Sequence, residues 1–258
     1  MSGEFTDGAN DGEEPFGERV AARYDELSAG MFDPAVVEPA VDFLAELALD
    51  GTRAGRGRAL ELGIGTGRIA LPLSARGVEV HGIDLSRAMV ARLRAKVGSD
   101  AIGVTIGDFA TTRVEGSFDL AYLVFNTIMN LRTQEEQVEC FRNVAEHLMP
   151  GGCFVIEVMT PDLRRLPPGE RALVFHLEPG YAGLDEYDVA EQRLTSHHFR
   201  SDGHFERFDG RYVWPSELDL MARLAGLRLR ERWGGWAREP FTGESRQHVS
   251  VWEKPGSA

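Results

Sequence analysis

The sequence predicts an α/β protein whose mostly parallel sheet carries helices on both faces. From about residue 59 to residue 159, short apolar segments alternate with segments of helical periodicity, and such repetition requires right-handed crossovers between parallel strands. Each of the first four strand segments runs directly into glycine or polar residues. After about residue 171 the pattern changes to strands joined by a hairpin turn, which indicates an antiparallel insertion.

A glycine-rich turn follows the first strand segment. That segment ends near Glu61, and the chain then passes through Gly63, Gly65 and Gly67 before a helix opens at Arg68. Backbone packed this tightly at a helix N-terminus leaves amide donors free and lets a ligand lie against the main chain. The turn is therefore predicted to bind a ligand.

The next strand segments end on residues that suit a nucleoside. The segment at 78–83 ends at Asp84, where dinucleotide-type folds place an acid that accepts hydrogen bonds from both ribose hydroxyls. The segments at 102–106 and 118–124 end on Asp108 with Phe109 and on Phe125 with Asn126. An acid beside an aromatic ring could bind and cover a flat heterocycle. All these residues follow strand carboxyl ends, where an open parallel sheet binds its ligand.

Two nucleotide-binding fingerprints do not fit the glycine turn. A nicotinamide or flavin domain needs Gly-x-Gly-x-x-Gly, so that the third glycine lets helix and strand pack closely. In this chain the third position is Arg68 in one register and Ala70 in the other. There is also no Gly-Lys-Ser/Thr motif, which argues against nucleotide hydrolysis.

The combination resembles the class I S-adenosylmethionine (SAM) dependent methyltransferases. The motifs that carry the resemblance are Glu61-x-Gly63-x-Gly65-x-Gly67, Asp84, Gly107-Asp108-Phe109 and Leu148-Met149-Pro150-Gly151-Gly152. The resemblance covers residues 16–125 closely and extends to residue 254 in element order. The chain looks most like small-molecule enzymes such as glycine N-methyltransferase relatives and the amine methyltransferases of antibiotic pathways.

The resemblance implies a Rossmann-like fold with one catalytic domain over residues 15–258. Its seven-stranded, mostly parallel sheet would end in an antiparallel hairpin at 227–233 and 247–252. Helices at 16–29 and 35–49 would form a lid within residues 15–50. Residues 161–213 would be a small antiparallel β insertion over the substrate site, and residues 1–14 an acidic, disordered tail.

The resemblance also assigns residues to the parts of SAM. Asp84 would hold the ribose, Glu61 and the Phe125 carbonyl the ammonium, and Asp108 the adenine amino group. The full expected set is Tyr24, Glu61, Gly63, Gly65, Gly67, Arg68, Asp84, Leu85, Met89, Asp108, Phe109 and Phe125. The product would be S-adenosyl-L-homocysteine.

Several of these residues have an alternative interpretation. Glu61 could instead cap nearby amides at the strand end. Tyr24, which is expected to contact the methionine carboxylate, could simply pack against the core, and Arg68 could face that carboxylate or the solvent. The other apolar candidates, which would line the adenine pocket, could equally belong to the core: Leu85, Met89 and Phe109.

The sequence leaves the catalytic residues unknown. Methyl transfer from a sulfonium is an in-line displacement that gains much of its rate from alignment of the acceptor in a water-poor pocket. A neutral amine needs little base catalysis, whereas a phenol or alcohol usually needs a base or a metal. The candidates for a base are His197 and His198, for which surface or packing roles are the alternative. Candidates to line the acceptor site are Asn126, Trp236, Arg238 and Phe241.

Composition limits the partners. The net charge is −13, of which −11 falls in residues 1–50, so no basic face for nucleic acid is visible. No apolar run reaches the length of a membrane span and no secretory signal is present, so we expect a cytoplasmic protein. The seven histidines and two cysteines show no metal-ligand spacing, so no metal is expected. The oligomeric state is unknown, and a homodimer is compatible with the sequence.

These observations predict a SAM-dependent methyltransferase that acts on a nitrogen or oxygen of a small-molecule acceptor, with nitrogen slightly favoured, in specialised metabolism. The Asn/Asp-Pro-Pro-Tyr pattern of enzymes that methylate adenine or glutamine nitrogens is absent after the fourth strand, where Asn126-Thr127-Ile128 stands. The alternative is a non-catalytic SAM-binding regulator, or an inactive partner subunit of the same fold.

Overall fold

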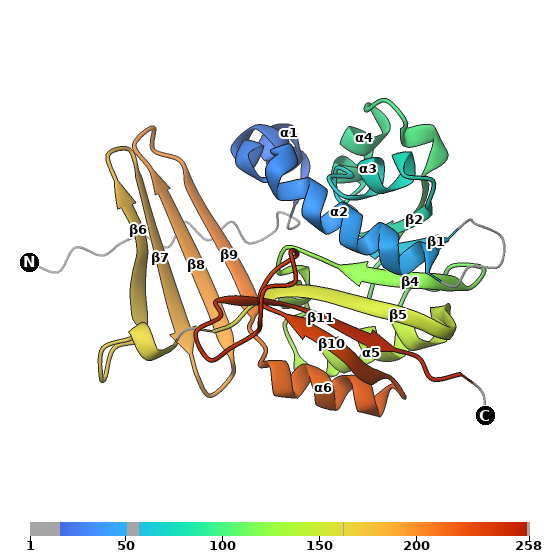
Figure 1. The fold of residues 1–258 in the computed structure, drawn as a ribbon. Coiled ribbons are helices and arrows are strands. Elements are labelled where there is room, and N and C mark those ends of the chain that lie inside the picture. Colours follow the sequence, from blue (N-terminus) through green and yellow to red (C-terminus); the bar gives the residue numbers. More distant parts are fainter. Residues whose placement is uncertain (1–15, 51–56, 162, 257–258) are drawn as a thin grey trace, which may run out of the picture.

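A seven-stranded sheet forms the centre of the computed structural model, which describes residues 16–50, 57–161 and 163–256 (Figure 1). The strand order is β10-β11-β5-β4-β1-β2-β3. The strands are β1 (Arg58–Leu62), β2 (Glu79–Asp84), β3 (Gly103–Ile106), β4 (Phe118–Leu123), β5 (Leu148–Met159), β10 (Arg228–Trp233) and β11 (Gln247–Glu253). The predicted disordered tail, residues 1–14, lies outside the described residues.

The sheet confirms the predicted Rossmann-like architecture. β1 pairs in parallel with β2 and β4, and β5 pairs in parallel with β4. β11 is antiparallel to both β5 and β10, as the expected C-terminal hairpin requires. The order of the strands reverses between β1 and β4, and such a reversal creates a crevice at the carboxyl edge of the sheet.

Helices cover both faces of this sheet, and each face has its own apolar core (Figure 1). On one face lie α2 (Pro34–Leu49), α3 (Ala70–Ala75) and α4 (Arg87–Arg94), and on the other α5 (Gln134–His147) and α6 (Pro215–Leu224). α1 (Glu18–Leu27) packs on α4. The short helices are η1 (Ala29–Phe32), η2 (Ser99–Ala101), η3 (Thr127–Asn130) and η4 (Leu163–Arg165).

In the sequence, Asp33 before Pro34 and Thr133 three residues before Glu136 predict two helix starts, and the structure confirms both. The Asp33 side chain accepts a hydrogen bond from the Ala35 amide, with Pro34 at the first helical position of α2. Thr133 and Glu136 form the complete capping box of α5. These bonds satisfy amide groups that have no partner within the helix. The predicted N-terminal pair of helices is thereby confirmed, with η1 between them.

Two element boundaries differ from those that the sequence pattern predicts, which are a strand from Cys153 after Pro150-Gly151-Gly152 and a helix from Ser86 to Val97. β5 begins at Leu148 rather than at Cys153, because Met149–Gly152 forms an irregularity within the strand, with Gly151 at φ +86°. α4 was expected to reach Val97 but ends at Arg94, and the chain turns through η2 before β3.

The insertion is a separate four-stranded antiparallel sheet, as predicted, but it contains a strand that we missed. Its strands are β6 (Ala172–Glu178), β7 (Tyr181–Asp188), β8 (Arg193–Arg200) and β9 (Phe205–Arg211). β7 escaped prediction because Gly183 and three acidic residues interrupt its apolar alternation. Pairing on both sides with β6 and β8 outweighs this low propensity.

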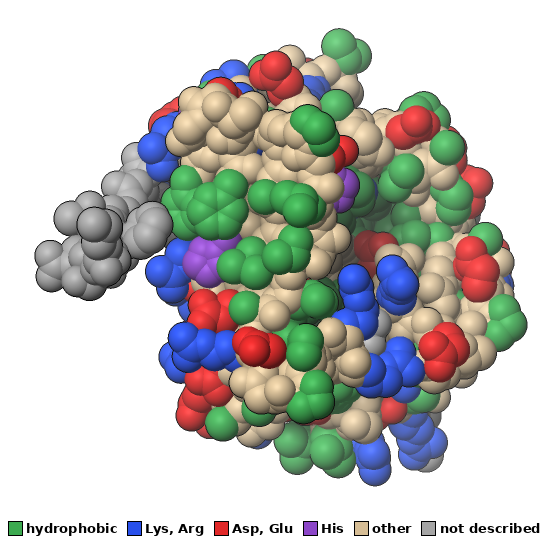
Figure 2. Space-filling view, turned by 90° about the vertical axis from the view of Figure 1, so that its left-hand side faces the viewer, with side chains coloured by type: hydrophobic (Ala, Val, Ile, Leu, Met, Phe, Trp, Pro, Cys, Tyr) green, Lys and Arg blue, Asp and Glu red, His purple; other side chains and the backbone are tan. Residues whose placement is uncertain are grey.

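One face of the four-stranded sheet packs on the main domain. Tyr187 and Leu194 belong to the same core as α5, and Gly210 approaches the Met129 carbonyl so closely that a Cβ there would lie 3.0 Å from it. Figure 2 shows apolar side chains gathered on the exposed side of the molecule at this sheet, and a hollow beside it with acidic and basic side chains along it. Exposed apolar residues of β6, β8 and β9 include Val174, Leu177, Phe199 and Phe205.

A buried polar network fixes the four-stranded sheet to α5 and α6. Arg211 is 5% exposed, and its guanidinium donates to Glu217 Oε1 at 2.7 Å and to Gln137 Oε1 at 2.6 Å. Burial alone would raise the pKa of Glu217, but hydrogen bonds from Arg211, Gln192 and Gln134 outweigh burial and lower that pKa. The network joins segments that are far apart in the chain.

We expect Glu217→Ala to lower the free energy of unfolding by about 3 kcal/mol, because it leaves the buried Arg211 charge without its carboxylate partner. Glu135→Ala, at an exposed position of α5, should change stability by no more than about 0.5 kcal/mol. Urea denaturation of both variants measures the difference. Equal stability of the two would show that the network does not stabilise the fold.

Candidate functional site

The carboxylate of Asp84 joins the end of β2 to the glycine turn, which we call the glycine loop (residues 63–67). Oδ2 accepts a hydrogen bond from the Gly65 amide at 2.7 Å, and Oδ1 accepts one from the Ser86 amide at 2.8 Å. Burial raises the pKa of Asp84 despite these two bonds. Asp84 is half-buried and points at the loop. Each oxygen keeps a second lone pair, so a pair of hydroxyl groups could still donate to it.

Left-handed backbone conformations shape the glycine loop. Gly63, Gly65 and Gly67 have φ angles of +73°, +54° and +81°, which side chains other than glycine rarely tolerate. A Cβ at Gly63 would lie 2.7 Å from the Thr127 side chain, and one at Gly67 would lie 2.3 Å from the Leu93 side chain. The loop therefore requires glycine for space as well as for conformation.

Glu61 is a buried acid just before the loop. It is 3% exposed, and its Oε2 accepts a hydrogen bond from the Tyr122 hydroxyl at 2.9 Å. Burial raises the pKa of Glu61 to about 8, although Tyr122, nearby Arg68 and the Ala70 amide act in the other direction. Burial thus favours the protonated form of Glu61 in the free protein. A cation bound beside Glu61 would favour its ionised form.

The other candidate cofactor-binding residues differ in their burial and in their contacts. Tyr24 of α1 packs with Met89 and with the edge of the Phe16 ring, and its pKa is raised by burial and lowered by Arg68. Leu85 is 64% exposed, which leaves its apolar surface free to contact a ligand. Farther along the edge, Phe109 is buried, and Asp108 is exposed with one carboxylate oxygen accepting from the Ala110 amide. Their assignments to parts of SAM stay predictions.

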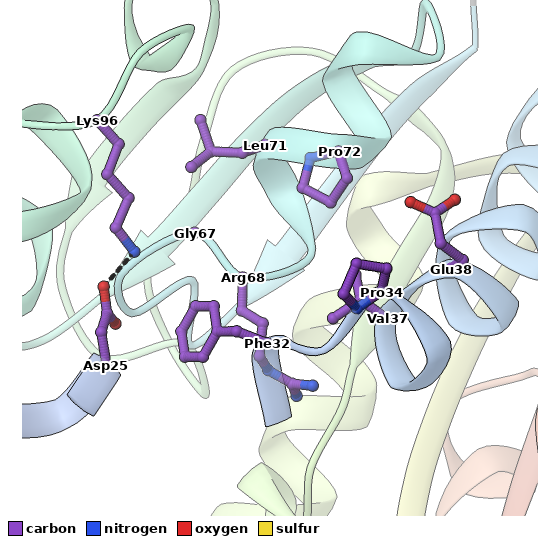
Figure 3. Close-up of a pocket in the computed structure, with 10 residues that line it drawn as sticks. All are labelled: Asp25, Phe32, Pro34, Val37, Glu38, Gly67, Arg68, Leu71, Pro72 and Lys96. Carbon is purple, nitrogen blue, oxygen red and sulfur yellow. Dashed lines mark ion pairs between the residues drawn. The ribbon is translucent and has the colours of Figure 1, made fainter. Parts of the chain in front are cut away.

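A contact that we did not predict ties α1 to the glycine loop. Asp25 accepts a hydrogen bond from the Thr66 hydroxyl at 2.6 Å and pairs with the Lys96 ammonium at 2.5 Å. The same ammonium donates to the Thr66 carbonyl at 2.9 Å. Figure 3 shows this ion pair at one end of a cavity of about 410 Å³, lined also by Phe32 and Arg68. Lys96 is one of two lysines in the chain, and this rarity is the feature of the sequence that could have pointed to the contact.

The cavity of Figure 3 touches the loop at Gly67 and Arg68, whereas Asp84 and Glu61 are not among its lining residues. It lies between the N-terminal helices and the start of α3. We therefore take the Asp84 edge, where β2 ends beside the glycine loop, as the candidate site, and the cavity as a separate space between the N-terminal helices and α3.

A strained turn follows β4 at the same edge of the sheet. Phe125 and Asn126 have φ angles of +56° and +60°, and two consecutive left-handed residues other than glycine persist only where their surroundings hold them. Glu157 of β5 does so: its Oε2 accepts from the Phe125 amide at 2.9 Å. The Asn126 side chain accepts from the Met159 amide at 2.7 Å. The Arg68 guanidinium lies 5.1 Å from the centre of the Phe125 ring.

Glu157 was missed by sequence reasoning. The signal was available, because this residue is the one carboxylate in an otherwise apolar strand, Cys-Phe-Val-Ile-Glu-Val-Met. A carboxylate near the carboxyl end of a central strand faces the ligand edge of such a sheet.

The candidate acceptor residues lie in three places. Asn126 belongs to the strained turn. Trp236 and Arg238 pack together on α2, through the Phe43 ring at 5.6 Å and 4.7 Å, and Arg238 also pairs with Glu46 at 2.6 Å. By contrast, the Phe241 ring packs on the buried His248. The structure therefore does not bring Phe241 together with Trp236 and Arg238.

The two candidate histidines lie on opposite sides of β8. His198 Nδ1 is 2.6 Å from the Tyr181 hydroxyl and its Nε2 is 3.2 Å from the Ser196 hydroxyl, so both ring nitrogens have partners. Burial lowers the pKa of His198. On the other side, His197 stacks on Phe199 and Phe205.

Comparison with known proteins identifies this arrangement. Residues 59–152, from β1 to the irregular start of β5, match a family model described as a methyltransferase domain. The chain is 36% identical to a solved structure, the CcbJ methyltransferase from Streptomyces caelestis, over 93% of this chain and 97% of that one, with a TM-score of 0.79. The chain belongs to the class I SAM-dependent methyltransferases.

Two curated relatives agree with this assignment. This methyltransferase is 28% identical over 240 residues to the cypemycin N-terminal methyltransferase of a Streptomyces species, covering 90% of this chain and 97% of that protein. It is 32% identical over 188 residues to the putative methyltransferase YqeM of Bacillus subtilis strain 168, covering 67% of this chain and 74% of that protein.

The residues present fit the cofactor of this family. Asp84 offers carboxylate oxygens beside the glycine loop, and the absence of side chains at the loop's glycines suits a ligand that lies against the main chain. Across residues 16–50, 57–161 and 163–256, no three His, Cys, Asp or Glu side chains lie close enough to hold a metal ion. Within the same ranges no helix is long and apolar enough to cross a bilayer.

We expect Asp84→Ala to weaken SAM binding at least about tenfold, because a hydrogen bond to a charged group contributes about 1.5–3 kcal/mol. Asp100→Ala, at an exposed acid of η2, should leave the affinity unchanged. Titration calorimetry with SAM measures both. If Asp84→Ala binds SAM as tightly as the parent, the ribose assignment is wrong.

The raised pKa of Glu61 predicts pH-dependent cofactor binding. If Glu61 holds the SAM ammonium, it must release its proton on binding, so affinity should increase between pH 6 and pH 8 by up to about tenfold per unit. Glu61→Gln has no proton to release and should remove this part of the slope. Identical pH profiles for parent and variant would contradict a direct role of Glu61 toward the ammonium.

Proposed function

We propose that this methyltransferase transfers the methyl group of SAM to the nitrogen of a small-molecule amine, in specialised metabolism and in the cytoplasm. The observation that carries the preference for nitrogen is the state of the two histidines. Both ring nitrogens of His198 are engaged, and His197 stacks on the opposite side of its strand. The ring of His198 is therefore not free to deprotonate a hydroxyl acceptor, and His197 Nε2 lies 3.8 Å from the Glu186 carboxylate on the other side of the strand. A neutral amine needs no base for the transfer.

Bound SAM supplies an electrophilic methyl group on a sulfonium. In the proposed complex, Asp84 holds the ribose hydroxyls, and Glu61 with the Phe125 carbonyl holds the ammonium of the methionine end. Asp25, Thr66 and Lys96 keep α1 over the glycine loop, which keeps water away from the reacting groups. Rate acceleration then comes mainly from alignment of the acceptor.

The four-stranded sheet supports a small, enclosed acceptor. Arg23 of α1 lies 2.9 Å from His204 in the turn between β8 and β9, so the lid and the insertion contact each other above the carboxyl edge of the main sheet. A bulky macromolecule would have to separate them. The name of the cypemycin relative, an N-terminal methyltransferase, also favours nitrogen as the modified atom.

A panel of acceptors tests this proposal. Transfer of labelled methyl from SAM would be measured with aliphatic amines, phenols and carboxylates of matched size, using the full chain. We expect turnover with one or more amines and none with the matched phenols at neutral pH. Turnover confined to phenols or carboxylates would overturn the assignment to nitrogen. SAM binding without turnover on any acceptor would instead favour the non-catalytic alternative.

A further inference from the structure

The Glu157 carboxylate can accept more hydrogen bonds than its structural role uses. Its Oε2 accepts the Phe125 amide, and its main-chain oxygen accepts the Asn126 amide at 3.3 Å. Its second carboxylate oxygen, Oε1, accepts no hydrogen bond from the part of the chain that the structure describes. The side chain is half-buried at the carboxyl end of β5.

This carboxylate also lacks a cationic partner. Among the ion pairs of the described ranges none includes Glu157. The guanidinium of Arg68 lies over the neighbouring Phe125 ring instead and donates to the Met31 carbonyl at 3.3 Å. A partly buried charge without a partner is unfavourable unless a ligand compensates it.

The position of Glu157 relates it to the transferred methyl group. β4 lies between β1, which leads into the glycine loop, and β5, which carries Glu157. The residue that Glu157 holds, Phe125, is the one whose carbonyl is expected to face the methionine end of SAM. In the proposed complex, Glu157 therefore lies on the side of Phe125 away from Asp84, where an acceptor would approach the methyl group.

We propose that Glu157 binds and orients the acceptor amine, an inference that rests on the proposed function. Its Oε1 accepts a hydrogen bond from an N–H of a neutral primary or secondary amine, whose lone pair then faces the methyl carbon. The nitrogen forms a bond to that carbon, and the carbon–sulfur bond breaks with its electron pair left on sulfur. The positive charge thus moves from sulfur to nitrogen, where the carboxylate stabilises it.

Sinefungin tests this without knowledge of the acceptor, because it carries a protonated amine where SAM has its methylsulfonium. Affinities of sinefungin and of S-adenosyl-L-homocysteine would be measured by calorimetry for the parent and for Glu157→Gln. The glutamine can still accept the Phe125 amide, so the strained turn is kept and only the charge is lost. In Glu157→Gln we expect the preference for sinefungin, the ratio of its affinity to that of S-adenosyl-L-homocysteine, to fall about tenfold or more. The affinity for S-adenosyl-L-homocysteine and the melting temperature should stay unchanged.

Two controls separate this role from a structural one. Glu253→Gln removes a half-buried carboxylate of β11 that lies 3.8 Å from the Arg230 guanidinium, at the opposite edge of the sheet, and it should leave the preference unchanged. Glu157→Asp keeps the charge and should retain part of the preference. An unchanged preference in Glu157→Gln, or an equal loss of both ligands, would overturn the proposal.

Methyl transfer adds a second readout. With benzylamine as acceptor, Glu157→Gln should lower kcat/KM about tenfold or more while the KM for SAM stays constant. If the parent methylates no amine at all, the proposed function fails, and the sinefungin preference still decides the role of Glu157.

Discussion

The carboxylate of Asp84 holds the glycine loop against the end of β2, and the rest of the site depends on this attachment. Its two oxygens accept the amides of Gly65 and Ser86, which fixes the loop on one side and starts α4 on the other. Because both bonds come from the main chain, they position the backbone whatever the nearby side chains do. The left-handed conformations of the glycines then follow from the short path between β1 and α3.

Around this attachment, the chain closes the site with two separate covers. α1 is held to the loop by Asp25, Thr66 and Lys96, whereas the four-stranded sheet is held to α5 and α6 by the buried Arg211 network. The charged groups that hold α1 are half-exposed, whereas those that hold the four-stranded sheet are buried. Since exposed ion pairs contribute little stability, α1 is the cover that can open at low cost to admit a ligand.

The sequence predicted the parts of this protein that short-range patterns determine. Glycine spacing, the acid after β2 and the capping residues of α2 and α5 each act within a few residues, so they could be read directly. β7 was missed because its acidic residues and Gly183 are accommodated by neighbours that are distant in the chain. Glu157 and Lys96 were missed for a related reason. Their significance lies in contacts to Phe125 and Asp25, which belong to other elements.

The acceptor side was the least predictable part of the site. Trp236 and Arg238 pack on α2, while Phe241 packs on His248, so neighbours in one loop point to different surroundings. Loop residues lack the periodicity that assigns a side chain to a face. The strained pair Phe125 and Asn126 likewise has no local signature, because its conformation depends on hydrogen bonds from β5.

A crystal structure of the full chain with S-adenosyl-L-homocysteine tests the central claim most directly. We expect the ribose hydroxyls within hydrogen-bond distance of the Asp84 carboxylate, the amino-acid part of the ligand over the glycine loop, and the sulfur facing Phe125 and Glu157. Density for the ligand in the cavity between α2 and α3, with Asp84 still bonded to backbone amides alone, would contradict it.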